Sequence, residues 1–131
     1  MNKKMKIGFI ALILIQALHS YEEILFKLWE VLKPARFISQ LLDDDLAYGF
    51  TIANIIIIFL GLICCILVFK FDDQNARKIV WFWVTVEYIN FLIHSTNSLI
   101  LMAYFPGVWS AQLLLVCSLY LNIQLRNTKL V

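Results

Sequence analysis

Both histidines of this sequence, together with Glu22, Glu23 and Glu87, lie inside apolar stretches, where ionisable side chains are costly and usually functional. His19, Glu22 and Glu23 fall within "LIQALHSYEEILF" (14–26), and Glu87 and His94 fall within "EYINFLIHSTNS" (87–98). Imidazole and carboxylate groups can exchange protons with a substrate or bind a divalent metal. The sequence therefore contains the residue types of an acid–base site or a metal site.

Helical spacing places these groups on common faces. At about 100° per residue, His19, Glu22 and Glu23 project from one side of a helix. The second stretch carries a stripe of polar residues on one face, made of Glu87, Asn90, His94, Asn97 and Ser98. We therefore predict two helices whose polar faces meet inside a bundle.

The elements that position these residues are apolar and long. The chain has 131 residues, of which 62% are hydrophobic and 15% charged, a composition typical of an integral membrane protein. Four windows approach the ~20 residues that cross a membrane, namely 7–26, 48–69, 79–104 and 108–125. The first could be a secretory signal, but "ALHSY" lacks the small residues of a cleavage site. We predict an all-α integral membrane protein, one domain over 1–131, forming a four-transmembrane-helix bundle.

The positive charges predict the orientation of this bundle. Of the eleven Lys and Arg residues, eight fall at the N-terminus, in the second loop and at the C-terminus: Lys3, Lys4, Lys6, Lys70, Arg77, Lys78, Arg126 and Lys129. Positive loops face the cytoplasm, so both termini are expected there, in a multi-pass protein of the cell membrane. The net charge of +2 gives no reason to expect a nucleic-acid partner, whereas membrane lipid is expected and a homo-oligomer is possible.

The cysteines are expected to fill space. Cys64, Cys65 and Cys117 lie in apolar runs without CxxC spacing, so they predict neither a disulfide framework nor a metal site. The loop 27–47 carries apolar residues at helical spacing around Pro34, which predicts two short amphipathic pieces. They would serve as a connector or as a lid over a site.

Counting about 1.5 Å per residue along each span places most of the polar groups at one depth. This level, in the outer half of the bilayer, includes His19, Glu22, His94 and the expected pocket residues Asn54, Asn90 and Gln112. Asn97 joins them through the polar stripe, and Glu87 lies one to two turns lower. We expect Glu22 to face His94 and Glu23 to border the site.

Three short motifs resemble a known family. "HSYEE" (19–23) fits the signature of the bacterial HXXEE-motif membrane proteins, whose activity is uncharacterised. "NFLIH" (90–94) is similar to their NxxxH segment, and "YFPGVWSA" (104–111) to their Y-x-P-G-x-x-T-A turn, with Ser110 where Thr is usual. The resemblance implies a multi-helix domain of the bacterial inner membrane. Its functional positions would be His19, Glu22, Glu23, Asn90 and His94, with Pro106 and Gly107 at the turn.

Several functions fit this pattern. The first is a metal-dependent enzyme acting on a lipid-like substrate, with zinc, iron or manganese held by His19, Glu22 and His94. Glu22, Glu23 and Glu87 are the candidate catalytic carboxylates. The alternatives are metal-free acid–base chemistry, binding of a small ligand, transport of protons or ions through Glu87, and a structural role without catalysis.

Overall fold

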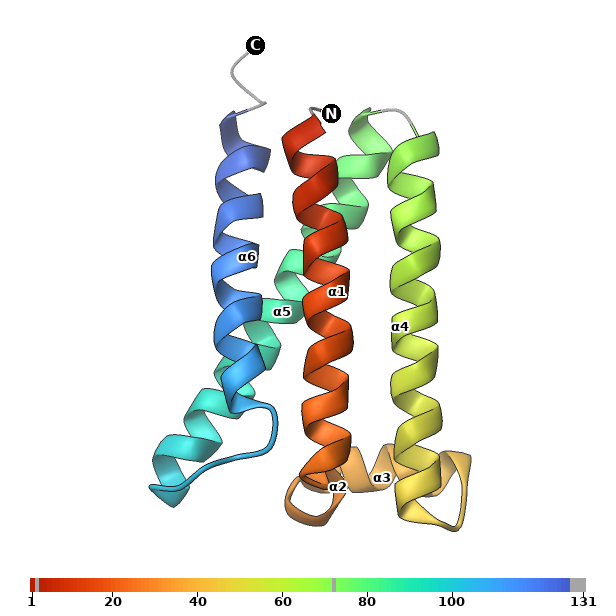
Figure 1. The fold of residues 1–131 in the computed structure, drawn as a ribbon, viewed down its shortest axis with the longest axis vertical. Helices are drawn as coiled ribbons and strands as arrows, with labels where there is room; N and C mark the ends of the chain where they lie inside the picture. Colours follow the sequence, from red (N-terminus) through yellow and green to blue (C-terminus); the bar gives the residue numbers. More distant parts are fainter. Residues whose placement is uncertain (2, 72, 128–131) are drawn as a thin grey trace.

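The computed structural model describes residues 1, 3–71 and 73–127, and the regular elements of these residues are six α-helices (Figure 1). Four are long: α1 (Lys3–Leu25), α4 (Leu46–Lys70), α5 (Asp73–Leu101) and α6 (Val108–Asn127). Two are short: α2 (Leu28–Val31) and α3 (Lys33–Leu42). The predicted all-helical class is confirmed, and each apolar window corresponds to one long helix. Lys129, one of the positive residues used to predict the orientation in the membrane, lies outside the described residues.

Within the described residues, three helices are long and apolar enough to cross a membrane: α1, α4 and α6. The expected fourth span falls in α5, which has 29 residues but is not among the three. Its length is sufficient to cross a membrane. It is not among the three because the polar stripe that includes Glu87, Asn90 and His94 lowers its mean hydropathy.

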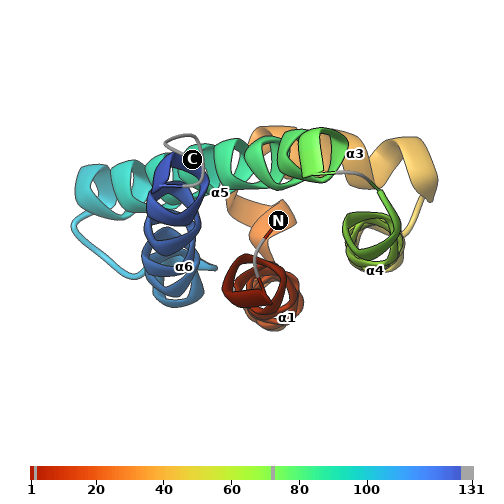
Figure 2. The same cartoon turned by 90° about the horizontal axis from the view of Figure 1, so that it is seen from above.

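The long helices alternate in direction, so α1 begins and α6 ends at the same end of the molecule (Figure 1). The short helices α2 and α3 lie at the opposite end (Figure 1). Viewed along the bundle, α5 is tilted and runs across one side of the other three long helices (Figure 2). This tilt carries the end of α5 away from α1, while its middle stays close.

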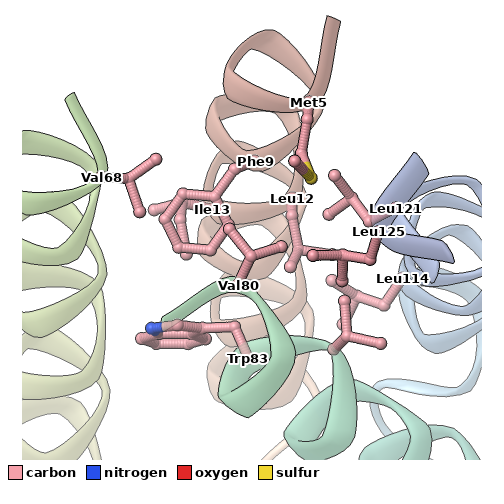
Figure 3. Packing of buried hydrophobic residues seen from close by; sticks show 11 residues of the cluster. Met5, Phe9, Leu12, Ile13, Val68, Val80, Trp83, Leu114, Leu121 and Leu125 are labelled. Atoms are coloured by element: carbon pink, nitrogen blue, oxygen red, sulfur yellow. The ribbon is translucent and has the colours of Figure 1, made fainter. Parts of the chain in front are cut away.

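The half of the bundle near the N-terminus is packed by apolar side chains. In α1, Met5, Phe9 and Leu12 follow one helical stripe and are fully buried. Around them pack residues of α4, α5 and α6 (Figure 3): Val68, Val80, Trp83, Val84, Leu114, Leu121 and Leu125. We call this set the apolar core. It fixes the position of α1 against α5 and α6, on which the polar residues further along α1 depend.

The predicted helical pieces of the first loop are α2 and α3. Pro34 is in the first turn of α3, where its missing N–H leaves no hydrogen bond unmade. Gly49 of α4 lies against the backbone carbonyl of Ser39, so any side chain there would push α3 away. Asp45 then caps α4 by accepting hydrogen bonds from the N–H groups of Ala47 and Tyr48, at 2.9 and 3.2 Å. These contacts hold α3 across the end of the bundle.

Candidate metal centre

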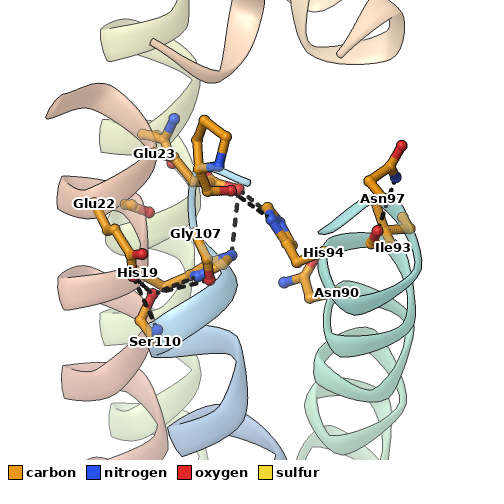
Figure 4. A network of polar contacts seen from close by, with 12 residues as sticks. His19, Glu22, Glu23, Asn90, Ile93, His94, Asn97, Gly107 and Ser110 are labelled. Atoms are coloured by element: carbon orange, nitrogen blue, oxygen red, sulfur yellow. Dashed lines mark hydrogen bonds and ion pairs between the residues drawn. The ribbon is translucent and has the colours of Figure 1, made fainter. Parts of the chain in front are cut away.

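Three buried side chains from two helices converge near the end of the bundle that α2 and α3 cover. His19 and Glu23 project from α1, and His94 projects from α5 (Figure 4). Glu23 Oε1 lies 3.2 Å from His19 Nε2 and 3.1 Å from His94 Nε2. One ligand atom from each residue falls within 4.8 Å of the others. This spacing would let a single metal ion contact all three residues.

The protonation of His94 is constrained on both sides of its ring. Its Nδ1 lies 2.6 Å from the carbonyl oxygen of Pro106, which can only accept, so Nδ1 carries a hydrogen. Its Nε2 faces the Glu23 carboxylate, which is also an acceptor when ionised. His94 Nε2 is therefore satisfied by its own proton, by a proton on Glu23, or by a metal ion in place of either proton.

His19 is oriented through a longer chain of contacts. Its Nδ1 lies 2.8 Å from Ser110 Oγ, whose hydroxyl donates to the Glu22 carboxylate. Because that hydrogen is committed to Glu22, Ser110 Oγ accepts from His19 Nδ1. Nε2 lies 3.2 Å from Glu23 Oε1, although no hydrogen bond forms between them. This contact is satisfied by a protonated His19, or, if His19 is neutral, by a cation that lies between the Nε2 lone pair and the carboxylate.

Gly107 holds the two imidazoles at this separation. Its φ of +87° is a left-handed conformation that favours glycine. A Cβ added there would lie 2.7 Å from His94 Cε1 and 2.9 Å from His19 Cε1. The rings themselves meet edge to face with centroids 4.7 Å apart. The turn before α6 is thus shaped to admit both rings, as the position of Gly107 between them in Figure 4 shows.

The expected pairing of Glu22 with His94 is wrong, because Glu23 makes that contact. Glu22 instead caps the start of α6. Its carboxylate accepts from the N–H groups of Trp109 and Ser110, at 3.3 and 2.9 Å, and from the Tyr104 hydroxyl at 2.6 Å. Partial burial and the neighbouring carboxylate raise the pKa of Tyr104. Glu22 was also expected as a metal ligand, but in the structure it orients Ser110 and through it His19.

Glu87 occupies a buried position on α5 that is separate from the His19–Glu23–His94 group. It is fully buried and accepts a hydrogen bond of 2.9 Å from Asn90 Nδ2. With the Gln16 amide turned so that both groups are satisfied, Gln16 Nε2 donates to both carboxylate oxygens at 3.1 Å. Glu87 is thus not part of the His19–Glu23–His94 group, in agreement with its expected lower depth.

The four expected pocket residues divide into two pairs. Asn54 and Asn90 line a cavity of about 190 Å³ that also reaches His19 and Glu23. Asn97 donates to the carbonyl of Ile93 in its own helix and points away from the histidines (Figure 4). Gln112 is exposed and donates to Ser95 on the outer side of α5 and α6.

These two misplacements have distinct causes. Asn97 shares the polar stripe, but the tilt of α5 carries its last turns away from α1. Gln112 was placed by depth alone, and depth does not say which way a side chain points. The expectation that Asn97 and Gln112 line the pocket is therefore wrong.

The short helices form one wall of this cavity. Leu28 and Leu32 contribute from the α2 region, and Ala35 and Ile38 contribute from α3. The alternative that the first loop covers a site agrees with this position. The cavity is mostly apolar, with the His19–Glu23 side as its polar wall.

Sequence reasoning identified His19, Glu23 and His94 but not the contacts that orient them. Ser110, the carbonyl of Pro106 and Tyr104 belong to the motif at 104–111, which was noted only through its resemblance to a family. A small hydroxyl residue at the third position of a helix, following Pro-Gly, was the available signal. Its hydrogen-bond partners lie about ninety positions earlier in the chain, in α1, so the sequence alone does not reveal them.

Comparison with known proteins identifies one relationship. Residues 10–121 match the model of a family described as proteins of unknown function with an HXXEE motif. The match covers all the residues that converge at the candidate metal centre. No curated protein and no solved structure matches the chain significantly.

Proposed function

The chain belongs to the family of proteins of unknown function with an HXXEE motif, and we propose that it is a metal-dependent enzyme of the membrane. The ion would be held by His19, Glu23 and His94. The observation that carries this proposal is the convergence of two imidazole Nε2 atoms on one buried carboxylate oxygen. Each Nδ1 is already engaged by a group outside the cluster, as is usual for histidines that bind metals.

Two histidines and one carboxylate form a ligand set that suits zinc, iron or manganese and leaves a coordination position open. When bound, such an ion would polarise a carbonyl group or activate a water molecule for hydrolysis. Pro106 and Ser110 hold the imidazoles in the tautomers that present Nε2 to the ion. The apolar walls of the adjoining cavity would exclude bulk water and receive a lipid-like substrate.

Metal-free acid–base catalysis is the second candidate, and one observation favours it. Glu23 and His94 are close enough to share a proton directly, so a carboxylate–imidazolium pair would also satisfy both groups. This pair does not engage His19 Nε2, which lies 3.2 Å from the same oxygen without a hydrogen bond, whereas one metal ion would engage both imidazoles. For this reason we prefer the metal.

We place the protein in the cell membrane as a bundle of four spans, with α5 as the fourth. The buried or partly buried positions of Glu87, Asn90 and His94 support this, because a crossing helix turns its polar groups inward. The positive residues of the α1 start, the α4 end and the α5 start share one end of the bundle, so that end would be cytoplasmic. The metal centre would then lie in the outer half of the bilayer.

This arrangement can be tested with reporters. A reporter protein that functions only in the cytoplasm, joined to either terminus, should be active. A fusion within the loop 43–45 should be inactive. Activity of that loop fusion together with inactivity of both terminal fusions would reverse the orientation, and unequal results at the two termini would contradict four spans.

Metal analysis of the purified protein tests the proposed enzyme class. Wild-type protein in detergent should contain about one equivalent of a transition metal, since one group of ligands is present among the described residues. His19→Ala and His94→Ala should lose it, whereas Glu30→Gln, an exposed acid paired with Lys27, should retain it. Absence of metal from wild-type protein, before and after incubation with zinc, iron or manganese, would eliminate the metal and favour the acid–base candidate.

A further inference from the structure

A second cavity lies beside the one that reaches the metal centre. It has a volume of about 370 Å³ and lies between α4 and α5, with walls that include Leu60, Cys64 and Val86. Gln16, Ile57 and Asn90 line both cavities, so the two meet at these residues. We call the pair the α4–α5 groove. It connects the polar His19–Glu23 wall to the apolar middle of the bundle.

The groove gathers most of the buried polar atoms that lack partners. Among the described residues, four buried side-chain atoms have no hydrogen-bond partner: His19 Nε2, Asn54 Oδ1, Trp83 Nε1 and Ser118 Oγ. The first three belong to residues that line the groove. Figure 3 shows the Trp83 ring directed toward α4 with its nitrogen on that side. The proposed metal ion would occupy His19 Nε2, and Trp83 Nε1 lies at the apolar cavity, so Asn54 Oδ1 is the buried atom whose missing partner points to a ligand, because unsatisfied buried groups are uncommon.

The shape and charge of the groove limit this ligand. The larger cavity is at the lower end of the range for small-molecule sites, which fits one hydrocarbon chain rather than the two of a phospholipid. No Lys or Arg is found among the described residues that line either cavity, and Glu23 faces one of them. Apart from an ion held by His19, Glu23 and His94, a phosphate or carboxylate head would meet an acid and no basic partner there. Asn54 Oδ1 requires a donor, which a hydroxyl or amide N–H supplies.

We propose that the α4–α5 groove binds a single-chain amphiphile whose uncharged head carries a hydroxyl or amide N–H, such as a monoacylglycerol. The head lies against Asn54, His19 and Glu23, and the chain extends between α4 and α5 past Ile57. In the proposed orientation the head is in the outer half of the bilayer and the chain reaches toward its middle. A lipid of the outer leaflet is oriented in the same way, with its head outward and its chain toward the middle of the bilayer. Binding of the amphiphile does not depend on the proposed enzyme activity; only the chemistry at its head group rests on that proposal.

Photo-crosslinking with a defined probe tests the groove. The probe is a long-chain monoacylglycerol with a diazirine in its chain, mixed with the purified full-length protein in detergent, and adducts are located by peptide mass spectrometry. We expect saturable labelling of residues 57–64 or 82–90 that unlabelled monoacylglycerol prevents. Labelling that does not saturate, or that a lysophosphatidate probe reproduces equally well, would overturn the proposal.

Matched variants separate the groove from the general lipid surface. Ile57→Trp places a large ring where the two cavities meet, and we expect labelling to fall about tenfold or more. Ile56→Trp makes the same change at the adjacent exposed position, which lines neither cavity, and should leave labelling unchanged. Asn54→Leu keeps the volume but removes the unpaired oxygen, so labelling should weaken several-fold. Equal labelling of wild type and all three variants would overturn the proposal.

Metal content measured on the same samples distinguishes this proposal from the preceding one. Ile57→Trp and Asn54→Leu should retain the metal of the wild type, because neither residue belongs to the ligand group. Saturable labelling in a protein without metal would overturn the metal enzyme and support the groove. Retained metal with unsaturable labelling would overturn the groove alone.

Discussion

The buried stripe of α1 has two halves that are built on different principles. From Met5 to Ile13 its buried side chains are apolar and pack in the apolar core. From Gln16 to Glu23 the same stripe is polar, and His19 has a defined partner on another element. The helix is continuous, so the change lies in its surroundings. In the first half, many side chains of roughly suitable volume would fill the space, whereas in the second each atom needs a complementary one.

This difference implies that the first half stabilises the bundle and the second serves a purpose other than stability. Polar contacts between membrane helices contribute only about 0.6–2 kcal/mol each, and a buried unpartnered nitrogen subtracts from that. A bundle selected for stability alone would continue the apolar stripe. Substitutions in the two halves should consequently affect different properties.

The largest expected effect is on metal binding by the polar half. Glu23→Gln should lower metal affinity by more than about 100-fold, since the loss of a ligand exceeds the ~10–100-fold effect of an outer contact. Glu22→Gln, a matched change at the adjacent acid, should have a smaller effect because Glu22 acts through Ser110. Competition with a coloured chelator measures both. A larger effect at Glu22 would contradict the assignment of Glu23 as the ligand.

The next effect is on stability through the apolar half. Phe9→Ala leaves a cavity in the apolar core and should lower the free energy of unfolding by roughly 3–5 kcal/mol. Metal stoichiometry should remain that of the wild type. Unfolding by SDS in mixed micelles provides the measurement, with Ile10→Ala, on the exposed side of the same helix, as the control. If Phe9→Ala abolished metal binding in the folded protein, the two halves would not be separable.

An intermediate effect is expected at the contact that orients His19. Ser110→Ala removes the partner of Nδ1 and frees the ring to adopt the other tautomer, which should weaken metal binding about tenfold. Ser110→Thr keeps the hydroxyl and should restore most of the affinity. The same chelator competition applies. Equal losses in the Ala and Thr variants would show that volume, rather than the hydroxyl, matters at this position.

The smallest effect is expected at the rim of the polar half. Tyr104→Phe removes one donor to Glu22 and should cost about 1 kcal/mol of stability or less, because both groups are partly solvated. Since the pKa of Tyr104 is raised, this contribution is complete below the ordinary tyrosine value of about 10 and is lost as pH rises above it. Unfolding of wild type and Tyr104→Phe between neutral and alkaline pH measures the difference. A difference that grew with pH would contradict the raised pKa.

The sequence was sufficient to predict the helices and the meeting of His19 with His94. The lengths of the apolar windows gave the long helices, because the cost of leaving backbone polar groups unpaired in lipid forces such stretches to be helical. The polar stripe of α5 and the polar face of α1 were expected to meet because, in a membrane, such faces turn inward. Gly49 and Gly107, in contrast, have roles that depend on what packs against them, and these contacts appear only in the fold.

The adjacent acids Glu22 and Glu23 show most clearly what the sequence alone does not determine and the tertiary structure does. Both lie on the same side of α1, about 100° apart, and spacing alone cannot say which one faces α5. The start of α6 settles it, because its free N–H groups lie beside Glu22 and draw that carboxylate toward them. Glu23 is left to meet both histidines. Residue type and spacing determined that a His–Glu site exists, and the placement of one helix end determined which glutamate belongs to it.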